Sequence, residues 1–410
     1  MRVLIHDYAG HGFTLQLARA LAARSHDVSY LHGGGLRAPR ASMKQHPGDP
    51  PKLQITPVGI NEPLHSRAGP QRLLQERRYG AVLATHITSH QPDVVLSVPS
   101  SLDAQRAAQR AAKSVEAGFV YWLQDVYSEA VERLLGRRIP AAGKLLAAPF
   151  ARLERDIFRR SDAIVAITDD FLALLQEWRI PIGRVTVIPN WAPLDEIRPL
   201  TKVNSWSTEH RLADSQVLMY SGTLGRKHDP TLLLALADGI PDARIVVVAE
   251  GAGSGRLGDM DVSERTNLVL LPLQPAQRHN EVLATADVLV AILDADANVF
   301  SVPSKVLTYL AAGRPILAAI PHANLAARTI MEAGAGRTVE PSDRDGFVAA
   351  ARDMLAHSEA RAAAGIAARA YAETAFAIVG IAEQFEAVLS RARPTRARSG
   401  GASDTADARD

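Results

Sequence analysis

The chain alternates between short runs of apolar, β-branched residues and longer segments in which apolar positions recur with helical spacing. The short runs have the length of buried strands, and the longer segments have the pattern of amphipathic helices. Such alternation is typical of α/β folds with parallel sheets. In the first half of the chain, strands are predicted at residues 2–6, 28–32, 94–98, 119–123, 163–167 and 185–188.

A second series of strands follows a stretch rich in Pro, Asn and Ser, residues 189–214. Two series separated by one loop predict two Rossmann-like parallel-sheet domains that face a cleft. The second-series strands are predicted at residues 217–221, 244–249, 268–271, 288–292, 316–319 and 336–339.

The domain boundaries follow from this division. We expect a first domain over residues 1–195, completed by a C-terminal helix at 372–391, and a second domain over residues 196–371. Residues 36–72 are rich in Pro, Gly and His with little periodicity, and predict a long functional loop or flap. The polar end of the chain, residues 392–410, is expected to be disordered.

Composition excludes several classes of protein. The 410 residues carry 46 basic and 44 acidic side chains, so the formal charge of +2 argues against a nucleic-acid partner. No cysteine is present, which excludes disulfides and thiolate metal sites. The first residues do not have the pattern of a signal peptide, and no apolar run is long enough to span a bilayer. We therefore expect a cytoplasmic enzyme.

The first predicted strand ends in a glycine-containing turn that bears Gly10 and Gly12, directly before a helical pattern. Glycines at this point allow backbone to approach an anionic ligand at the helix start. The full dinucleotide fingerprint and the lysine of a P-loop are both missing, so a plain tight turn is an equal alternative.

Two acids, Asp125 and Glu129, follow the strand at 119–123. The carboxyl end of a parallel strand lies at the mouth of the cleft, where a carboxylate can act as a base or hold an acceptor hydroxyl. A helix cap with an acid in the first turn is the competing interpretation.

Residues 136–160 combine basic and apolar side chains in a helical pattern. A basic amphipathic helix suits an anionic membrane surface. A solvated helix face packed on its own sheet is the alternative.

The second series of strands has three loops of interest. Gly222, Thr223, Arg226 and Lys227 lie in one loop, where two cations beside glycine amides suit a phosphate. Glu250 begins a Gly-rich turn after the next strand, and Leu273 and Gln274 follow a third, where a planar base could rest. Exposed turns and ordinary connections are the alternatives.

The segment 301–317 predicts a helix that begins near Pro303, with Ser301 or Val302 as its cap and Ser304 and Lys305 in its first turn. Gly313 is expected to end the helix. A lysine is unfavourable at a helix start unless a bound anion compensates. A diphosphate would supply that anion.

These features together resemble the retaining family-4 glycosyltransferases of the GT-B fold, over about residues 1–390. The similarity rests on short motifs in order along the chain, of which the last is the most specific. They are His26-Asp27-Val28, Val187-Ile188-Pro189-Asn190, Ser221-Gly222-Thr223, Ala286-Asp287 and Pro303-Ser304-Lys305 with Tyr309 to Pro315. Asn190-Trp191 and Gln124 to Tyr127 also suit the branch that builds capsule, O-antigen or exopolysaccharide.

The sequence departs from that family in one respect. Many members carry two glutamates around this helix, one on the donor sugar and one on the ribose. Phe300 and Thr308 occupy those positions here. We expect Ser304 and Lys305, with Asn298 and Ser301, to take over part of the donor contacts.

The resemblance implies transfer of a hexosyl or N-acetylhexosaminyl unit from a nucleotide-diphosphate sugar to a polyprenyl-linked or saccharide acceptor, with retention. Lys305 and Arg226 or Lys227 would hold the diphosphate, Asp125 and Glu129 would serve the acceptor, and Thr308 would lie at the ribose. The first domain would bind the acceptor and the second the donor. No cofactor or metal is expected, and the enzyme would touch the inner membrane face. A nucleotide-sugar epimerase of the same fold, a non-catalytic nucleotide-sugar-binding subunit and a nicotinamide dehydrogenase remain the alternatives.

Overall fold

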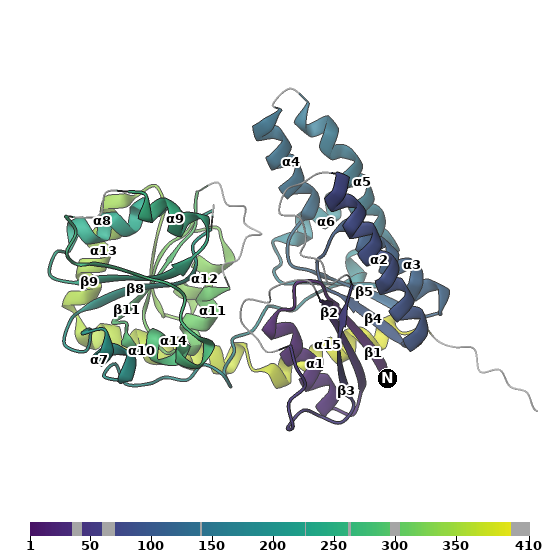
Figure 1. Ribbon diagram of the computed structural model, residues 1–410, viewed down its shortest axis with the longest axis horizontal. Helices are drawn as coiled ribbons and strands as arrows, with labels where there is room; N and C mark the ends of the chain where they lie inside the picture. The colour runs from purple at the N-terminus through teal and green to yellow at the C-terminus, as the bar shows by residue number, and fades with distance from the viewer. Residues whose placement is uncertain are drawn as a thin grey trace, which may run out of the picture.

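The computed structural model describes residues 1–34, 43–59, 70–139, 142–225, 227–260, 264–295 and 304–394. Two parallel sheets, each with helices packed against it, form two domains joined by the segment after β7 and by the C-terminal helices (Figure 1). The predicted α/β fold with two Rossmann-like domains is confirmed.

The first sheet has seven strands in the order β3-β2-β1-β4-β5-β6-β7, and all its pairs are parallel. The order in which strands are added to the sheet reverses between β1 and β4. Sheets of this kind bind ligands at such a switch point, at the carboxyl ends of the strands. The strands are β1 (Arg2–Asp7), β2 (Asp27–Gly33), β3 (Leu53–Val58), β4 (Val94–Ser97), β5 (Gly118–Leu123), β6 (Ala163–Ala166) and β7 (Val185–Val187).

One strand in this sheet corrects the sequence analysis. The prediction of a single long loop over residues 36–72 is wrong for β3, which pairs with β2 in register from Leu53 to Val58. β3 lies at the edge of the sheet and contains Pro57, which an edge strand tolerates because its outer side makes no ladder hydrogen bonds. The strand contains no continuous apolar run, because it includes Pro57 and the polar Gln54 and Thr56, and it could not be predicted from such a run.

Before the linker, the described residues form six helices and one short 3₁₀ turn around the first sheet. The longest, α2, begins where the predicted loop was expected to end, and α4 and α5 form a hairpin whose tip projects away from the sheet (Figure 1). They are α1 (Gly12–Ala23), α2 (Pro70–His90), α3 (Leu102–Ser114), α4 (Tyr127–Arg138), α5 (Gly143–Arg160), α6 (Phe171–Glu177) and η1 (Ile182–Arg184).

The second sheet has six parallel strands in the order β10-β9-β8-β11-β12-β13, and its switch point lies between β8 and β11. Its strands are β8 (Val217–Thr223), β9 (Arg244–Glu250), β10 (Leu268–Leu271), β11 (Val288–Ile292), β12 (Ile316–Ala319) and β13 (Gly336–Val339). Its helices are α7 (Ser205–Glu209), α8 (Thr231–Gly239), α9 (Ala252–Gly258), η2 (Ala276–Arg278), α10 (His279–Thr285), α11 (Lys305–Ala311), α12 (Leu325–Glu332), α13 (Arg344–Ala356) and α14 (Ser358–Ala375).

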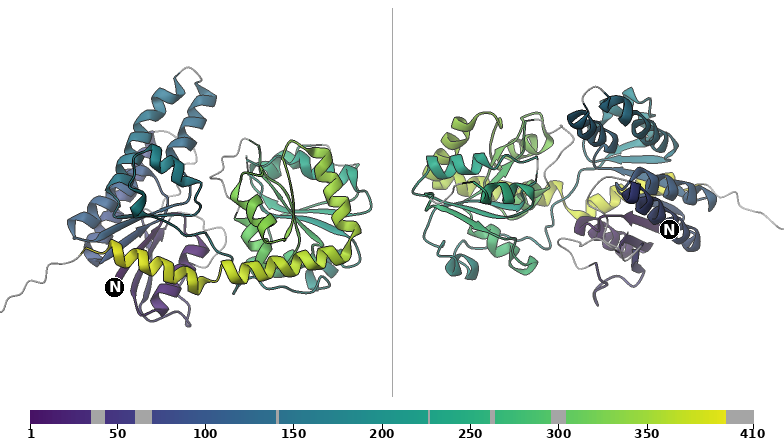
Figure 2. Two further views of the ribbon diagram at one scale, coloured as in Figure 1. Left: turned by 180° about the vertical axis from the view of Figure 1, so that it is seen from behind. Right: turned by 45° about the horizontal axis from the view of Figure 1, so that its top comes forward.

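The last helix, α15 (Ile378–Ala392), returns to the first domain (Figure 2). It packs against α1 and the strands β4, β5 and β6. Phe385 meets Trp122 edge-on, with ring centroids 4.8 Å apart, and Glu386 accepts hydrogen bonds from Arg24 and His26. The stretch Ser358–Ala392 is apolar and long enough to pass as a membrane span, but this is weak evidence because its second half is packed against a sheet.

An ion pair joins the two domains away from the linker. Arg328 on α12 donates to the carboxylate of Asp170 at 2.8 Å, and Asp170 lies in the turn before α6. Thr168 donates its hydroxyl to the same carboxylate at 2.8 Å, which fixes the acceptor in place. The pair therefore ties the second domain to the first sheet across the space between them.

Candidate active site

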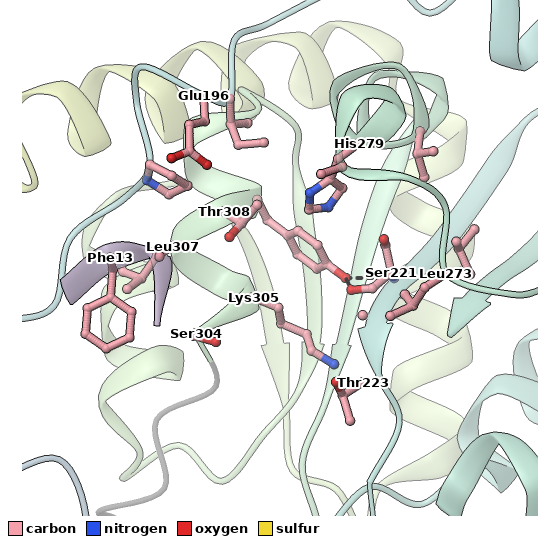
Figure 3. Close-up of a pocket in the computed structure, with 18 of the residues that line it drawn as sticks. Phe13, Glu196, Ser221, Thr223, Leu273, His279, Ser304, Lys305, Leu307 and Thr308 are labelled. Carbon is pink, nitrogen blue, oxygen red and sulfur yellow. Dashed lines mark hydrogen bonds between the residues drawn. The ribbon is translucent and has the colours of Figure 1, made fainter. Parts of the chain in front are cut away.

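A cavity of about 1010 Å³ lies between the two domains, at the carboxyl edge of the second sheet (Figure 3). The turn into α1 and the segment after β7 form one wall, and the ends of β8 and β9 with helix α11 form the other. Nine of the predicted site residues line it: Gly12, Gly222, Thr223, Glu250, Leu273, Gln274, Ser304, Lys305 and Thr308.

Lys305 begins α11 and points its ammonium group into the cavity (Figure 3). The Nζ atom donates to the hydroxyl of Tyr220 and lies 3.6 Å from the centroid of that ring. Tyr220 in turn donates to the carbonyl of Thr223 at 2.7 Å. The cation is therefore held at the end of β8 by a buried aromatic ring rather than extended into solvent.

Helix α11 is shorter than the sequence predicts. It begins at Lys305 rather than near Pro303, and Ser304 precedes it without a capping hydrogen bond from its side chain. Gly313 has φ +64° just after the helix, the left-handed conformation expected where a helix ends. Arg226 and Ser301, like Phe300, lie outside the described residues.

Tyr309 belongs to the motif noted in the sequence, but its role was not predicted: it joins α11 to β8. Its hydroxyl donates to the carbonyl of Ser221 and accepts from the amide of Ser221, both at 2.9 Å. The two residues are 88 positions apart, so no local pattern links them. Tyr309 thereby fixes the helix that carries Lys305 against the strand end that carries Gly222.

Gly222 lies near the end of β8, and its φ of +129° is open to glycine but strained for other residues; the loop to His228 follows. Within it, the amide of Gly225 donates to Nδ1 of His228 at 2.8 Å. His228 lines the cavity, whereas Lys227 lies outside its lining. The predicted role of Lys227 stays a prediction.

Three predicted residues form the far end of the cavity. Gln274 is held at both ends of its amide, because it donates to the carbonyl of Pro272 at 2.9 Å and accepts from Trp206 at 3.2 Å. Leu273 offers an apolar surface beside it, and Glu250 ends β9 opposite. A flat apolar surface next to a fixed amide suits a planar nucleobase.

Thr308 lines the cavity at one of the two positions where relatives carry glutamate. Besides Glu250, a second carboxylate lines the cavity: that of Glu196, in the segment after β7 (Figure 3). Gln16 donates to Glu196 at 3.1 Å and accepts from Trp191 at 3.0 Å, so this acid is held by the first domain. Glu196 was not predicted from the sequence, because it lies in the long segment between β7 and α7, well beyond the end of the strand.

The two glycines predicted in the turn between β1 and α1 differ in their position relative to the cavity. Gly12 lines the cavity, but Gly10 does not, and the amide of Gly10 donates to Asp7 at 3.2 Å. The Asp7 carboxylate also accepts from His11 Nδ1 at 2.9 Å and from the Tyr30 hydroxyl at 2.9 Å. Burial opposes charge on Asp7, but these bonds outweigh it and hold its pKa below the ordinary value. A donor contact for Gly10 stays a prediction.

Asp125 and Glu129 lie outside the cavity lining. Asp125 is exposed and accepts from the amide of Val126 at 2.9 Å, and Glu129 pairs with Arg133 at 3.1 Å in the first turns of α4. Their acceptor roles stay predictions. The start of α4 is instead bound by Glu154 on α5, whose carboxylate accepts from the amides of residues 127 and 128, both at 2.9 Å. Burial raises the pKa of Glu154.

The two ends of α5 differ in burial, and membrane contact by residues 136–160 stays a prediction. The end of α5 packs inward, since Ile157 and Phe158 are buried and Arg155 lies 5.0 Å from the centroid of the Trp178 ring. The start of α5 is open, with Leu145 78% and Leu146 47% exposed. The start of α5 therefore presents apolar side chains to solvent.

Comparisons with known proteins agree with this architecture. Residues 11–191 match the family model of the glycosyl transferase 4-like domain. No curated protein matches the sequence.

Solved structures align over almost the whole chain. Sucrose-phosphate synthase from Thermosynechococcus elongatus has a TM-score of 0.73 at 15% identity, with 95% of this chain and 98% of that chain covered. HepE of Anabaena in complex with UDP has 0.69 at 14%, with 95% and 100% covered. The UDP-forming trehalose-phosphate synthase from Burkholderia xenovorans, in complex with glucose-6-phosphate, has 0.65 at 13%, with 95% and 100% covered.

Identities this low show the fold and not the substrate. The chain therefore has the GT-B fold, and residues 11–191 are similar to the glycosyl transferase 4-like domain.

Proposed function

We propose that the protein transfers a sugar from a nucleotide diphosphate to an acceptor hydroxyl, with retention of the anomeric configuration. One observation carries the proposal: the cavity between the domains holds Lys305 and the Gly222 loop on one wall and the turn into α1 on the other. Its volume of about 1010 Å³ is that of a large ligand site. A donor on one domain and an acceptor on the other would meet there.

The residues on the donor wall suit a departing diphosphate. Charge develops on that group as the sugar bond breaks, and a fixed cation such as Lys305 stabilises it without rearrangement. The departing phosphate oxygen takes the proton of the acceptor hydroxyl on the same face of the sugar. This step forms the new glycosidic bond, breaks the old one and needs no protein nucleophile.

The donor contacts differ from those of relatives with paired glutamates. Ser304 and Thr308 line the cavity on the α11 side and are proposed to hydrogen-bond the sugar and the ribose. Leu273 and Gln274 are proposed to hold the base.

The transferred sugar is proposed to be a hexosyl or N-acetylhexosaminyl unit, and the acceptor a glycan on a polyprenyl lipid, in the synthesis of a surface polysaccharide. The exposed Leu145 and Leu146 near Lys144 support a peripheral contact with an anionic membrane, because apolar side chains beside a cation suit that surface. The donor and lipid sites would then lie on one enzyme at the inner face of the membrane.

The test is to incubate the protein with UDP-, GDP-, ADP- and TDP-sugars and a polyprenyl-diphosphate sugar, and to follow both the released nucleotide and the lipid product. UDP-sugars come first because related folds were solved with UDP and UDP-glucose. The anomeric configuration of the product is read by NMR. Isomerised donor in the absence of acceptor would identify an epimerase instead, and nucleotide binding without turnover would indicate a binding subunit.

A further inference from the structure

His228 is a histidine of the donor wall whose tautomer the surrounding bonds determine. Its Nδ1 atom accepts the amide hydrogen of Gly225 at 2.8 Å, so Nδ1 carries no proton. The Tyr220 hydroxyl lies 3.4 Å from the same nitrogen but directs its own proton to Thr223. The ring proton therefore lies on Nε2.

The surroundings keep this ring neutral. Burial is the largest cause, followed by the positive charges of Lys305 and Lys227, and together they lower the pKa of His228 to about 4. At neutral pH the ring is thus an uncharged donor at Nε2 and an acceptor at Nδ1. Because both neighbouring lysines oppose protonation, His228 contributes a directed hydrogen-bond donor to this wall of the cavity and not a positive charge.

The Nε2–H group lies on the edge of the ring opposite the Gly225 bond, and His228 lines the cavity. Within the part of the chain that the structure describes, Nε2 has no hydrogen-bond partner. A half-buried N–H beside Lys305 and the Gly222 turn is available to a ligand in the cavity, which can replace water as its acceptor. Next to two lysines, that acceptor would be anionic.

We propose that His228 donates its Nε2–H to an oxygen of the donor diphosphate, while its Nδ1 holds the Gly225 loop in place. The inference rests on the proposed function, because it takes the ligand to be a nucleotide diphosphate. Lys305 supplies the charge that neutralises the phosphate, and His228 fixes its orientation. Neither task requires a change in protonation during the reaction.

Two substitutions separate the two ring nitrogens. In His228→Asn the amide oxygen stands near the position of Nδ1 and can still accept from Gly225, but nothing reaches the position of Nε2. In His228→Gln the amide nitrogen reaches the position of Nε2, but the Gly225 bond is lost. His357→Asn, at an exposed histidine on the end of α13, is the matched control.

The experiment is titration calorimetry of the full chain with UDP, UMP and uridine, with GDP, ADP and TDP as further probes. We expect His228→Asn to bind UDP about five- to thirtyfold more weakly, with uridine binding unchanged. His228→Gln should retain more of the UDP affinity than His228→Asn does. Thermal melting of each variant shows that it folds.

The results of the titration distinguish failure of the His228 contact from failure of the proposed function. If the wild-type protein binds UDP and His228→Asn binds it equally well, the proposed phosphate contact is wrong while the proposed function stands. If His228→Gln binds more weakly than His228→Asn, the loop bond matters and the Nε2 donor does not. If the wild-type protein binds none of the nucleoside diphosphates, the proposed function fails and this inference fails with it.

Discussion

Lys305 and Tyr220 form a paired unit at the floor of the cavity: the ammonium group donates to the phenol oxygen and also lies 3.6 Å from the centroid of the same ring. Tyr220 belongs to β8 and is almost fully buried, whereas Lys305 begins α11. Tyr220 on the strand therefore fixes the position of the Lys305 ammonium group at the start of the helix. A cation held in this way is ready for an anionic leaving group before any ligand arrives.

Removal of this cation is expected to slow sugar transfer. Lys305→Ala should lower kcat by about 10²-fold, because one preorganised group on the developing charge is worth that much. The measurement is the rate of nucleotide release with donor and acceptor saturating. Lys113→Ala, at an exposed lysine of α3, is the control. Transfer by Lys305→Ala at the wild-type rate would remove Lys305 from the mechanism.

Tyr220→Phe tests how the lysine is held. The ring and its attraction for the cation are kept, but the hydroxyl that binds Lys305 and Thr223 is lost. This variant should therefore lose less activity than Lys305→Ala. A larger loss would mean that the hydroxyl itself contacts the substrate.

Opening of the cleft should depend on the pair between Arg328 and Asp170. The pair is partly exposed, so its contribution is at most about 1 kcal/mol, which is a roughly fivefold change in the balance of open and closed forms. Arg328→Ala should therefore raise the radius of gyration measured by small-angle scattering without changing the melting temperature of either domain. Arg337→Ala, which removes a pair within the second domain, is the control. Identical scattering from the two variants would contradict the interdomain role.

Stability should fall as the pH drops below the ordinary pKa of histidine. His6 is buried between Ser97 and Tyr79, and burial lowers its pKa to about 4, although the nearby Asp7 opposes the shift. The unfolded chain binds a proton near pH 6.5 and the folded chain only near pH 4. The contribution of neutral His6 is thus complete above pH 6.5 and is lost progressively down to pH 4.

The expected loss from His6 is up to about 3 kcal/mol over that window, a value set by the difference between the two pKa values. Urea unfolding at a series of pH values measures it, and His6→Gln should flatten the curve between pH 6.5 and 4. An equally steep curve for His6→Gln would assign the pH dependence to other groups.

The strands were predictable because burial on both faces leaves an apolar run that can be read directly, as in β5 and β11. β3 was not predictable in this way, because an edge strand can hold Pro57 and polar side chains. Gly222 was found because it lies at the end of a predicted strand, and strand ends gather at one edge of a parallel sheet. Lys305 was found for another reason: a lysine is unfavourable at a helix start unless an anion binds there.

The contacts that complete the site depend on residues far apart in sequence. Tyr309 meets Ser221 across 88 positions, and Glu196 is held by Gln16 across 180. His228 was visible in the sequence beside two cations, but its tautomer is set by a loop bond to Gly225. The pairings of Tyr309 and Glu196 follow from the packing of elements far apart in the chain, and the tautomer of His228 from the geometry of its own loop, so none of them can be derived from local periodicity.

We expect membrane binding to depend on the exposed Leu145 and Leu146 at the start of α5. Transfer of Leu145 from water into the headgroup region is worth about 1.5 kcal/mol or more, so Leu145→Glu should weaken binding to phosphatidylglycerol vesicles at least tenfold. Co-sedimentation with vesicles measures it, and UDP binding should not change because Leu145 lies outside the cavity lining. Ile366→Glu is a matched control, since Ile366 on α14 is 73% exposed and also apolar. Equal loss of vesicle binding in both variants would show a nonspecific effect of surface charge, and no loss in Leu145→Glu would remove α5 from the membrane contact.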